Sequence, residues 1–280
     1  MTGDPAGAEE IAVACGFDPD RPNAARIYDY LLGGKDNFAA DRQAAEKLAE
    51  ALPDAARVAR ANRAFLAAAV RQVAGFGIGQ YVDIGAGLPT TPNVHETVRT
   101  AVPDARVAYI DNDPLVVTHA RALLATDDKV TVISADAREY AAILSAPEFT
   151  GFIDPAKPVC VLFVSMLHFM AVSEAAAAVA AFREWMPQGS YLVISAGVGN
   201  ERSNPRQGRV QAAYGSEITL SGFTEAGLAA LFGDFELVPP GIVPVTEWPM
   251  ERADEPPSLR PMPVGPTTAG MLAGIGHKRG

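Results

Sequence analysis

Apolar and polar residues alternate along this chain with two different periods, which together predict strands separated by helices. Short apolar runs predict five successive strands at 81–84, 106–110, 130–133, 159–164 and 190–194. A helical spacing of apolar residues predicts helices between them at 94–102, 115–125 and 173–185, the last one capped by Ser173. Strands that alternate with helices predict an α/β fold with a parallel sheet and right-handed crossovers.

The pattern also predicts three helices before the first strand and several shorter elements after the fifth. The leading helices are expected at 24–32, 40–52 and 55–73, and Gly33-Gly34 ends the first of them. The segment 197–223 is long for a structureless loop, so it either contains a helix near 209–214 or forms a lid. The remaining elements are a helix at 225–232 capped by Thr224, a strand at 235–238, a stretch leaving the sheet at 242–248 and a last segment at 269–276.

These elements divide the chain into three parts. Residues 1–22 are acidic, small and aperiodic, and we expect a flexible segment there. Residues 23–74 are predicted to form a helical cap, and residues 75–280 to form the α/β domain. A chain of 280 residues can bury one sizeable core, so nothing demands a second full domain.

Composition narrows the classes of partner. The formal net charge is −10, so a nucleic-acid backbone would be repelled, and we expect no nucleic-acid substrate. The sequence has no run of about 18 apolar residues and no basic, apolar leader, so we expect no membrane span and a cytoplasmic location. Cys15 and Cys160 lie far apart and outside any metal-binding spacing, so we predict neither a disulfide nor a metal site.

A glycine turn follows the first predicted strand. Asp83 lies within that strand, and the turn consists of Gly85-Ala86-Gly87. Glycine allows the backbone to pass where a Cβ would collide with a ligand. A dinucleotide fingerprint would need a third glycine where Thr90 stands, and the chain has no Tyr-x-x-x-Lys pair, so an NAD-dependent reductase is disfavoured.

Acidic residues follow the next two predicted strands. Asp111 and Asn112 end the second strand, and Asp136-Ala137 follows the third. Because the carboxyl ends of parallel strands meet at one edge of a sheet, Asp111 is placed to accept hydrogen bonds from two ribose hydroxyls. Asp136 could accept one from an adenine amine. The series predicts a site for a nucleoside-like ligand that carries an amino-acid end.

Other candidates come from the cap and from the fourth strand. Tyr28 and Gly34 belong to a stretch that we interpret as a lid facing the ligand, and Arg63 could bind a ligand carboxylate bidentately. Ser165 follows the fourth strand. His168 is the candidate general base, and the alternative is an imidazole packed among its apolar neighbours.

Several sequence motifs of this chain resemble those of one known family. They are AARIYDYLLGGKDNF at 24–38, ANRAF at 61–65, DIGAGLPT at 83–90, NVHE at 93–96, YIDNDP at 109–114, HARALL at 119–124 and LHF at 167–169. With them the chain resembles a family of bacterial S-adenosylmethionine-dependent methyltransferases, long catalogued as an actinobacterial domain of unknown function. The resemblance spans nearly the whole chain from Asn23.

The resemblance implies a class I, Rossmann-like fold, with a mostly parallel seven-stranded sheet flanked by helices and an N-terminal helical cap. By the same analogy, we expect residues 269–276 to return as an antiparallel edge strand that completes the sheet. It implies S-adenosyl-L-methionine as cofactor and no particular substrate. The residues that we expect to bind the cofactor are Asp83, Gly85, Ala86, Gly87, Asp111, Asn112, Asp136, Ala137, Ser165, Arg63, Tyr28 and Gly34.

The predicted activity is methyl transfer to an oxygen or nitrogen of a small-molecule acceptor, with His168 as the catalytic residue. One departure from the family leaves an alternative open. Ser195-Ala196-Gly197 stands where relatives tend to carry a histidine, and the word at 220–224 is also altered. The alternative is therefore a protein that binds the cofactor and has lost or changed the methyl-transfer chemistry. The oligomeric state is left open, a homodimer included.

Overall fold

A computed structural model describes residues 16–199, 205–216, 218–249 and 270–280, with the side chains of 205–207 excluded. Most of the predicted segment 1–22 lies outside these residues. The sheet contains eight strands in the order β3-β2-β1-β4-β5-β8-β6, with β7 pairing with β8. Their bounds are β1 Gln80–Ile84, β2 Arg106–Asp111, β3 Val130–Ser134, β4 Cys160–Val164, β5 Tyr191–Gly197, β6 Glu236–Leu237, β7 Val243–Pro244 and β8 Met271–His277.

The first five strands are parallel, as the sequence predicts. The chain starts in the middle of the sheet at β1, moves outward through β2 and β3, and then returns to β4 on the other side of β1. The strand order therefore reverses between β1 and β4. Ligands of open parallel sheets bind at such a switch point, beyond the carboxyl ends of the strands.

The edge position predicted for the last strand is wrong. β8 is antiparallel but lies between β5 and β6, and the stretch expected to leave the sheet contributes β7 to it. Interior strands are packed on both faces. In β8, Gly274 and Gly276 lie where the ring of Phe232 packs against the strand. A Cβ at Gly276 would lie 2.6 Å from a ring carbon of Phe232. The two glycines of β8 thus leave room for that ring.

Helices flank the sheet. Their bounds are α2 Ala24–Leu32, α3 Ala39–Ala51, α4 Ala55–Gly75, α5 Val94–Arg99, α6 Pro114–Leu123, α7 Tyr140–Ser145, α8 Pro147–Thr150, α9 Val172–Trp185, α10 Pro205–Tyr214 and α11 Glu225–Phe232. The helix alternative for the segment 197–223 is confirmed by α10. The predicted Ser173 cap is wrong, because α9 begins at Val172 and Glu174 accepts a hydrogen bond from the backbone N–H of Ala171, at 2.9 Å.

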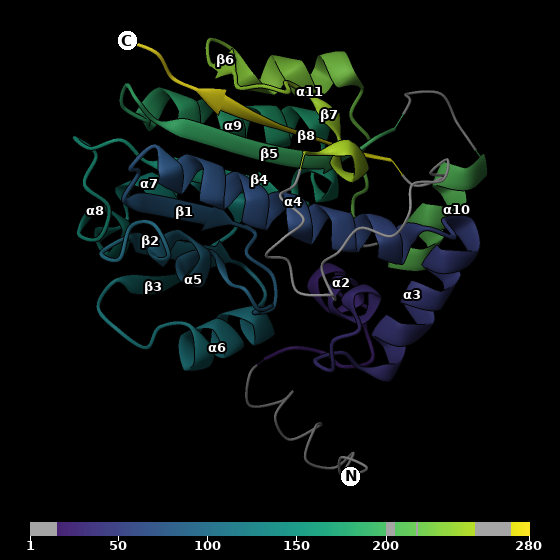
Figure 1. Ribbon diagram of the computed structural model, residues 1–280. Helices are drawn as coiled ribbons and strands as arrows, with labels where there is room; N and C mark the ends of the chain where they lie inside the picture. Colours follow the sequence, from purple (N-terminus) through teal and green to yellow (C-terminus); the bar gives the residue numbers. More distant parts are fainter. Residues whose placement is uncertain (1–15, 200–204, 217, 250–269) are drawn as a thin grey trace.

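Successive strand residues point into two apolar cores on opposite faces of the sheet. Tyr81 belongs to one core, which also contains α4, α5 and α6, whereas Val82 belongs to the other, with α7, α9 and α11. Figure 1 shows α4 lying along the sheet and extending toward α2 and α3. Phe65, Val70 and Val73 of α4 are fully buried in the first core. Residues on both faces are therefore sealed from water, as expected for a parallel sheet.

A smaller cluster of helices stands beyond the carboxyl ends of the strands. Ile27 of α2, Leu48 of α3 and Ala213 of α10 share one apolar cluster, so a helix from the second half of the chain packs against two from the beginning (Figure 1). Their arrangement also depends on a buried ion pair. Arg26 and Asp41 are 2% and 0% exposed, and Nε of Arg26 lies 2.9 Å from Oδ2 of Asp41.

The beginning of α2 is joined directly to the sheet side of the molecule. Oδ1 of Asn23 accepts from the N–H of Ala25 at 2.8 Å and so caps the helix. Nδ2 of the same side chain donates to Oδ2 of Asp113 at 2.6 Å, and Asp113 in turn caps α6. The cap helices are thereby positioned over the ends of β1 and β2.

Candidate functional site

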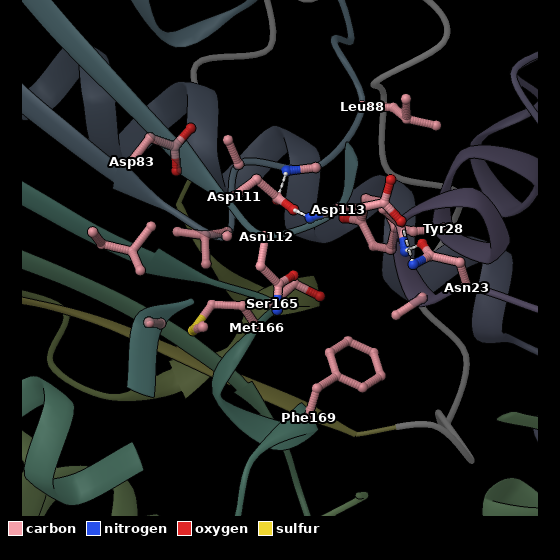
Figure 2. A pocket seen from close by; sticks show the side chains of 18 of the residues that line it. Asn23, Tyr28, Asp83, Leu88, Asp111, Asn112, Asp113, Ser165, Met166 and Phe169 are labelled. Carbon is pink, nitrogen blue, oxygen red and sulfur yellow. Dashed lines mark hydrogen bonds between the residues drawn. The ribbon is translucent and has the colours of Figure 1, made fainter. Parts of the chain in front are cut away.

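A cavity of about 210 Å³ opens beyond the carboxyl ends of β1, β2 and β4, between the sheet and the helices α2 and α4. Figure 2 shows Asp83, Asp111 and Asp113 along one side, with Ser165, Met166 and Phe169 opposite. All the predicted cofactor residues except Gly34 line this cavity. Gly34 lies in the turn after α2, where a Cβ would be 1.9 Å from a carboxylate oxygen of Asp29. It is Asp29 that lines the cavity there.

The glycine turn is folded tightly against the next strand. Gly85 has φ 69°, and a Cβ at this position would lie 2.8 Å from Cβ of Met166. Its N–H donates to the carbonyl of Ile110 at 2.8 Å. Gly87 has φ 67°, but a Cβ there would meet nothing within 4 Å. Both positions require the left-handed region, and Gly85 also requires the absence of a side chain.

Asp111 is fixed at the end of β2 by two backbone donors. The N–H of Gly87 donates to Oδ2 at 2.9 Å, and the N–H of Asp113 donates to Oδ1 at 3.0 Å. Burial raises the pKa of Asp111, against the effect of these hydrogen bonds. A carboxylate has about four acceptor positions, so this one can still accept from ligand hydroxyls.

Asp136 is more completely occupied by the protein itself. Its carboxylate accepts four hydrogen bonds, three from Arg138 and one from Nδ2 of Asn112. The side-chain bonds from Arg138, foremost, lower the pKa of Asp136 to about 2. An adenine amine would have to displace one of these donors. Arg138 also lines the cavity and is not among the predicted residues. Its only signal in the sequence is a cation two residues after a predicted site acid.

Asp83 has the opposite surroundings. It is 4% exposed, and no described residue donates a hydrogen bond to its carboxylate. Burial raises the pKa of Asp83 to about 7; the positive charge of Arg63 opposes this effect and the negative charge of Asp111 adds to it. A buried carboxylate without a partner is costly in a purely structural role. A cationic ligand group beside it would remove that cost.

Arg63 reaches the same cavity from α4. Its Nη2 donates to the carbonyls of Thr90 at 2.7 Å and Pro92 at 3.0 Å, which positions the guanidinium above the loop after β1. Its Nε is buried and has no hydrogen-bond partner among the residues that the structure describes. A buried donor with no partner points to a ligand acceptor such as a carboxylate.

A chain of hydrogen bonds that the sequence did not reveal connects the cap with the sheet. The N–H of Ser165 donates to Oγ of Ser195 at 3.0 Å, and that hydroxyl donates to Oδ1 of Asn62 at 2.6 Å. Nδ2 of Asn62 donates to the Tyr28 hydroxyl at 2.9 Å, which donates to the carbonyl of Ala59 at 3.0 Å. The Tyr28 hydroxyl is therefore engaged on both sides.

A second cavity of about 310 Å³ adjoins the first, and both are lined by Tyr28, Ser165 and Phe169. No described residue that lines it carries a charge. Its walls are formed by Leu31, Leu48, Leu52, Ala55, Val58, Ala59, His168, Gly197, Val198, Gly199, Val210, Tyr214, Leu220, Ser221, Gly222, Gly270 and Met271, besides the three shared residues. The site thus consists of a charged compartment joined to an apolar one.

His168 lines the second cavity and not the first. Its Nδ1 accepts from the N–H of Gly197 at 3.4 Å, and its ring lies 4.3 Å from that of Phe169. Burial lowers the pKa of His168 to about 4, so the imidazole is neutral near pH 7. The predicted catalytic residue is therefore placed in the apolar compartment, and its role stays a prediction.

The described part of the chain has neither a metal-binding cluster nor a membrane-spanning helix. Within it, no three or more histidine, cysteine or acidic side chains gather in a way that could hold a metal ion. None of its helices is both long and apolar enough to cross a membrane. Cys160 is buried in β4 as a free thiol.

Comparison with known proteins adds to this geometry. A family model described as S-adenosyl methyltransferase matches residues 12–279. A candidate methyltransferase from Thermobifida fusca is 39% identical; the match covers 95% of this chain and 98% of that one, with a TM-score of 0.83. A DUF574 family protein from Streptomyces avermitilis is 34% identical over 93% and 99% of the two chains, with a TM-score of 0.80. No curated protein matches.

Proposed function

Since the chain belongs to the S-adenosyl methyltransferase family, we propose that it transfers a methyl group to an oxygen or nitrogen of a small-molecule acceptor bound in the second cavity. The chain is an S-adenosylmethionine-dependent methyltransferase with the class I, Rossmann-like fold. The acceptor class and the residues that act on it are the parts proposed.

The charged compartment fits this cofactor. S-Adenosylmethionine carries an ammonium group, a carboxylate and a ribose diol. The unpartnered carboxylate of Asp83 would hold the ammonium, and the unpartnered Nε of Arg63 would hold the carboxylate. Asp111, with acceptor positions left beside its two backbone donors, would hold the ribose. These two groups are the strongest support, because neither has a hydrogen-bond partner among the described residues and each would gain one from the cofactor.

The observation that carries the proposal is the junction of the two cavities. Tyr28, Ser165 and Phe169 line both, so an acceptor in the apolar compartment would meet the cofactor between these residues. The cofactor supplies a methyl group already activated on a sulfonium. The chain's own residues then need to align the acceptor and exclude water, which the apolar walls of the second cavity favour.

One observation favours the alternative of a binding protein without methyl transfer. The Tyr28 hydroxyl is engaged on both sides, and no described residue lining the second cavity is a carboxylate or an amine. A phenol or alcohol acceptor would profit from a base. A neutral amine acceptor would not need one, so the arrangement remains compatible with transfer to nitrogen.

Calorimetry and turnover together test the proposal. We expect S-adenosylmethionine and S-adenosylhomocysteine to bind and NAD not to bind, and we expect S-adenosylhomocysteine to form with at least one member of a panel of small phenols and amines. Cofactor binding without turnover on any acceptor would favour the binding protein. Absence of cofactor binding would contradict both. The cytoplasmic location stays a prediction.

The variant Asp111→Ala makes this test specific for the site. It should lower the affinity for S-adenosylhomocysteine by about 1.5–3 kcal/mol, because hydrogen bonds to a charged group are lost. Asp104→Ala is the matched control, since Asp104 pairs with Lys129 on the exposed surface. Equal affinity of the two variants would remove the ribose role from Asp111.

A further inference from the structure

We propose that the second cavity binds an uncharged, planar and largely apolar molecule, and that Nε2–H of His168 donates a hydrogen bond to an acceptor atom of it. His168 would then position the methyl acceptor instead of removing its proton. The inference rests on the proposed function, because it assigns this cavity to the acceptor. It specifies the chemical class that the cavity admits.

The contrast in charge between the two cavities supports an uncharged molecule. The first is lined by seven ionisable side chains, namely Asp29, Arg63, Asp83, Asp111, Asp113, Asp136 and Arg138. No described residue lining the second is charged. An ionised carboxylate or amine moved from water into such surroundings would lose several kcal/mol of hydration without a partner. The described part of the lining of the second cavity therefore disfavours charged acceptors.

The walls of the second cavity favour a planar ring. The rings of His168 and Phe169 are 4.3 Å apart, and those of Phe169 and Tyr214 are 5.4 Å apart in an edge-on arrangement. Aliphatic side chains from α3 and α4, including Leu48 and Val58, complete the lining. Aromatic rings gain extra stabilisation from offset and edge-on contacts with other rings. A flat molecule bound in this cavity would have both aromatic and aliphatic side chains to contact.

The hydrogen bond at Nδ1 determines what His168 can offer. The N–H of Gly197 donates to Nδ1, so the neutral imidazole carries its proton on Nε2. No described residue accepts a hydrogen bond from Nε2. Because His168 lines the second cavity, this N–H is left available for an acceptor bound there. To act as a base there, the ring would have to shift its proton to Nδ1, which would place two N–H groups against each other.

These properties fit a molecule that has a carbonyl on an aromatic ring and a neutral nitrogen as nucleophile. The nitrogen lone pair would form the new N–CH₃ bond while the S–CH₃ bond breaks with its electron pair on sulfur. The extra N–H proton would leave to water after release. These steps require no base in the cavity, which agrees with the absence of carboxylates and amines among the described residues that line it.

Three naphthylamines with the same ring system test the inference on the protein saturated with S-adenosylhomocysteine. They are 6-acetyl-2-naphthylamine, 2-naphthylamine and 6-amino-2-naphthoate, whose binding is measured by fluorescence. We expect the acetyl compound to bind about tenfold tighter than 2-naphthylamine, as one net hydrogen bond allows. We expect the carboxylate to bind most weakly. Tighter binding of the carboxylate, or no binding of any of the three, would overturn the inference.

Variants separate donation from packing. His168→Gln retains an N–H donor and should keep the affinity for 6-acetyl-2-naphthylamine within about threefold, whereas His168→Phe should lower it about tenfold, to that of 2-naphthylamine. His168→Phe should also shift the emission of the bound acetyl compound to the blue, because its carbonyl loses a donor. If His168→Phe preserves both affinity and emission, His168 only packs and the inference fails.

A control variant and turnover complete the experiment. His277→Gln serves as the control, because His277 stacks on Tyr191 at the opposite end of β5. The affinity for S-adenosylhomocysteine, measured in each variant, reports whether the first cavity is intact. Probe binding that depends on His168 without any methylation would contradict the proposed transfer to such acceptors and support the inference. Methylation at an unchanged rate in His168→Phe would support the proposed transfer and contradict the role of His168 in the inference.

Discussion

Asp83 and Asp111 are acids of one cavity whose protonation is controlled by different surroundings. Asp111 is held by two backbone donors, whereas Asp83 has no donor in the described chain. The pKa of Asp83 is raised to about 7, mainly by burial, from an ordinary value of 3.8. Between these two values the folded protein keeps a proton that the unfolded chain has released. Asp83 therefore lowers the stability of the fold progressively as the pH rises from about 4 to about 7.

This effect can be measured with Asp83→Asn, which does not titrate. The free energy of unfolding of the variant minus that of the wild type should rise with pH by up to about 1.4 kcal/mol per unit between pH 4 and 7, and then level off. Urea unfolding of both proteins without ligand at several pH values gives this difference. A difference that is constant with pH would show that burial does not raise the pKa of Asp83 in the folded protein.

The two glycines of the turn after β1 differ in what a side chain would meet. Both have positive φ, so Gly85→Ala and Gly87→Ala should each lose about 1 kcal/mol of stability through backbone strain. Gly85→Ala adds a contact of 2.8 Å with Met166, which has to move. We therefore expect Gly85→Ala to have the lower melting temperature and Gly87→Ala to reveal strain alone. Equal melting temperatures of the ligand-free variants would contradict the close packing of Gly85 on Met166.

The sequence allows the cavity-lining residues at the strand ends to be predicted, and Tyr28 and Arg63 of the cap as well, but not the contacts that join the cap to the sheet. Asp83 and Asp111 follow recognisable strands, and parallel topology brings strand ends together. Asn62 and Ser195 are 133 positions apart and meet through a hydrogen bond that no local pattern indicates. Gly34 was assigned to the ligand because an unusual turn suggested a lid. Its backbone instead closes a turn around Asp29.

At the scale of elements, the beginning of α2 connects the cap with the site. Asn23 caps α2 and also donates to Asp113, which lines the first cavity. Asn23→Ala should cost about 1 kcal/mol of stability through the lost cap and, in addition, lower the affinity for S-adenosylhomocysteine several-fold, because α2 is no longer tied to the loop after β2. Thermal unfolding and calorimetry give the two quantities.

A second capping residue provides the control for Asn23. Thr224 caps α11 by accepting from the N–H of Gly227 at 3.0 Å, and it makes no contact with the first cavity. Thr224→Ala should therefore lose a similar amount of stability without a change in affinity. If Asn23→Ala behaves in the same way, the bond to Asp113 does not contribute to ligand binding.

Elements were predictable in proportion to their length and periodicity. The five parallel strands each contain a short apolar run, and the helices α2, α3 and α4 each have several turns. The strand predicted at 235–238 contains β6, whereas β7 has two residues and α8 has four, too few for a period to be recognised. The position of β8 could not be read locally at all, because it depends on which strand leaves its edge unpaired after β5.

At the scale of the whole molecule, α4 belongs both to the cap and to the core of the sheet. The prediction of a helical cap over 23–74 includes this helix, yet Phe65 and Val73 pack in the sheet's core while Ala55 at its other end packs with Ile27 of α2. The cap cluster by itself is small and rich in alanine. A cluster of that size buries too little apolar surface to be stable alone.

We therefore expect the cap and the sheet to unfold in one transition. Phe65 is fully buried and contacts Trp248 with ring centroids 4.7 Å apart, so Phe65→Ala should cost about 3–5 kcal/mol by leaving a cavity. Some amides of α2 and α3 exchange hydrogen only when the whole protein unfolds. Because α4 is shared between the cap and the sheet, Phe65→Ala should accelerate exchange of these amides by the same factor as exchange in β1. Mass spectrometry of peptides from the three elements measures this. Acceleration in β1 alone would mean that α2 and α3 open independently of the sheet, and the cap would then be a separate folding unit despite its shared helix.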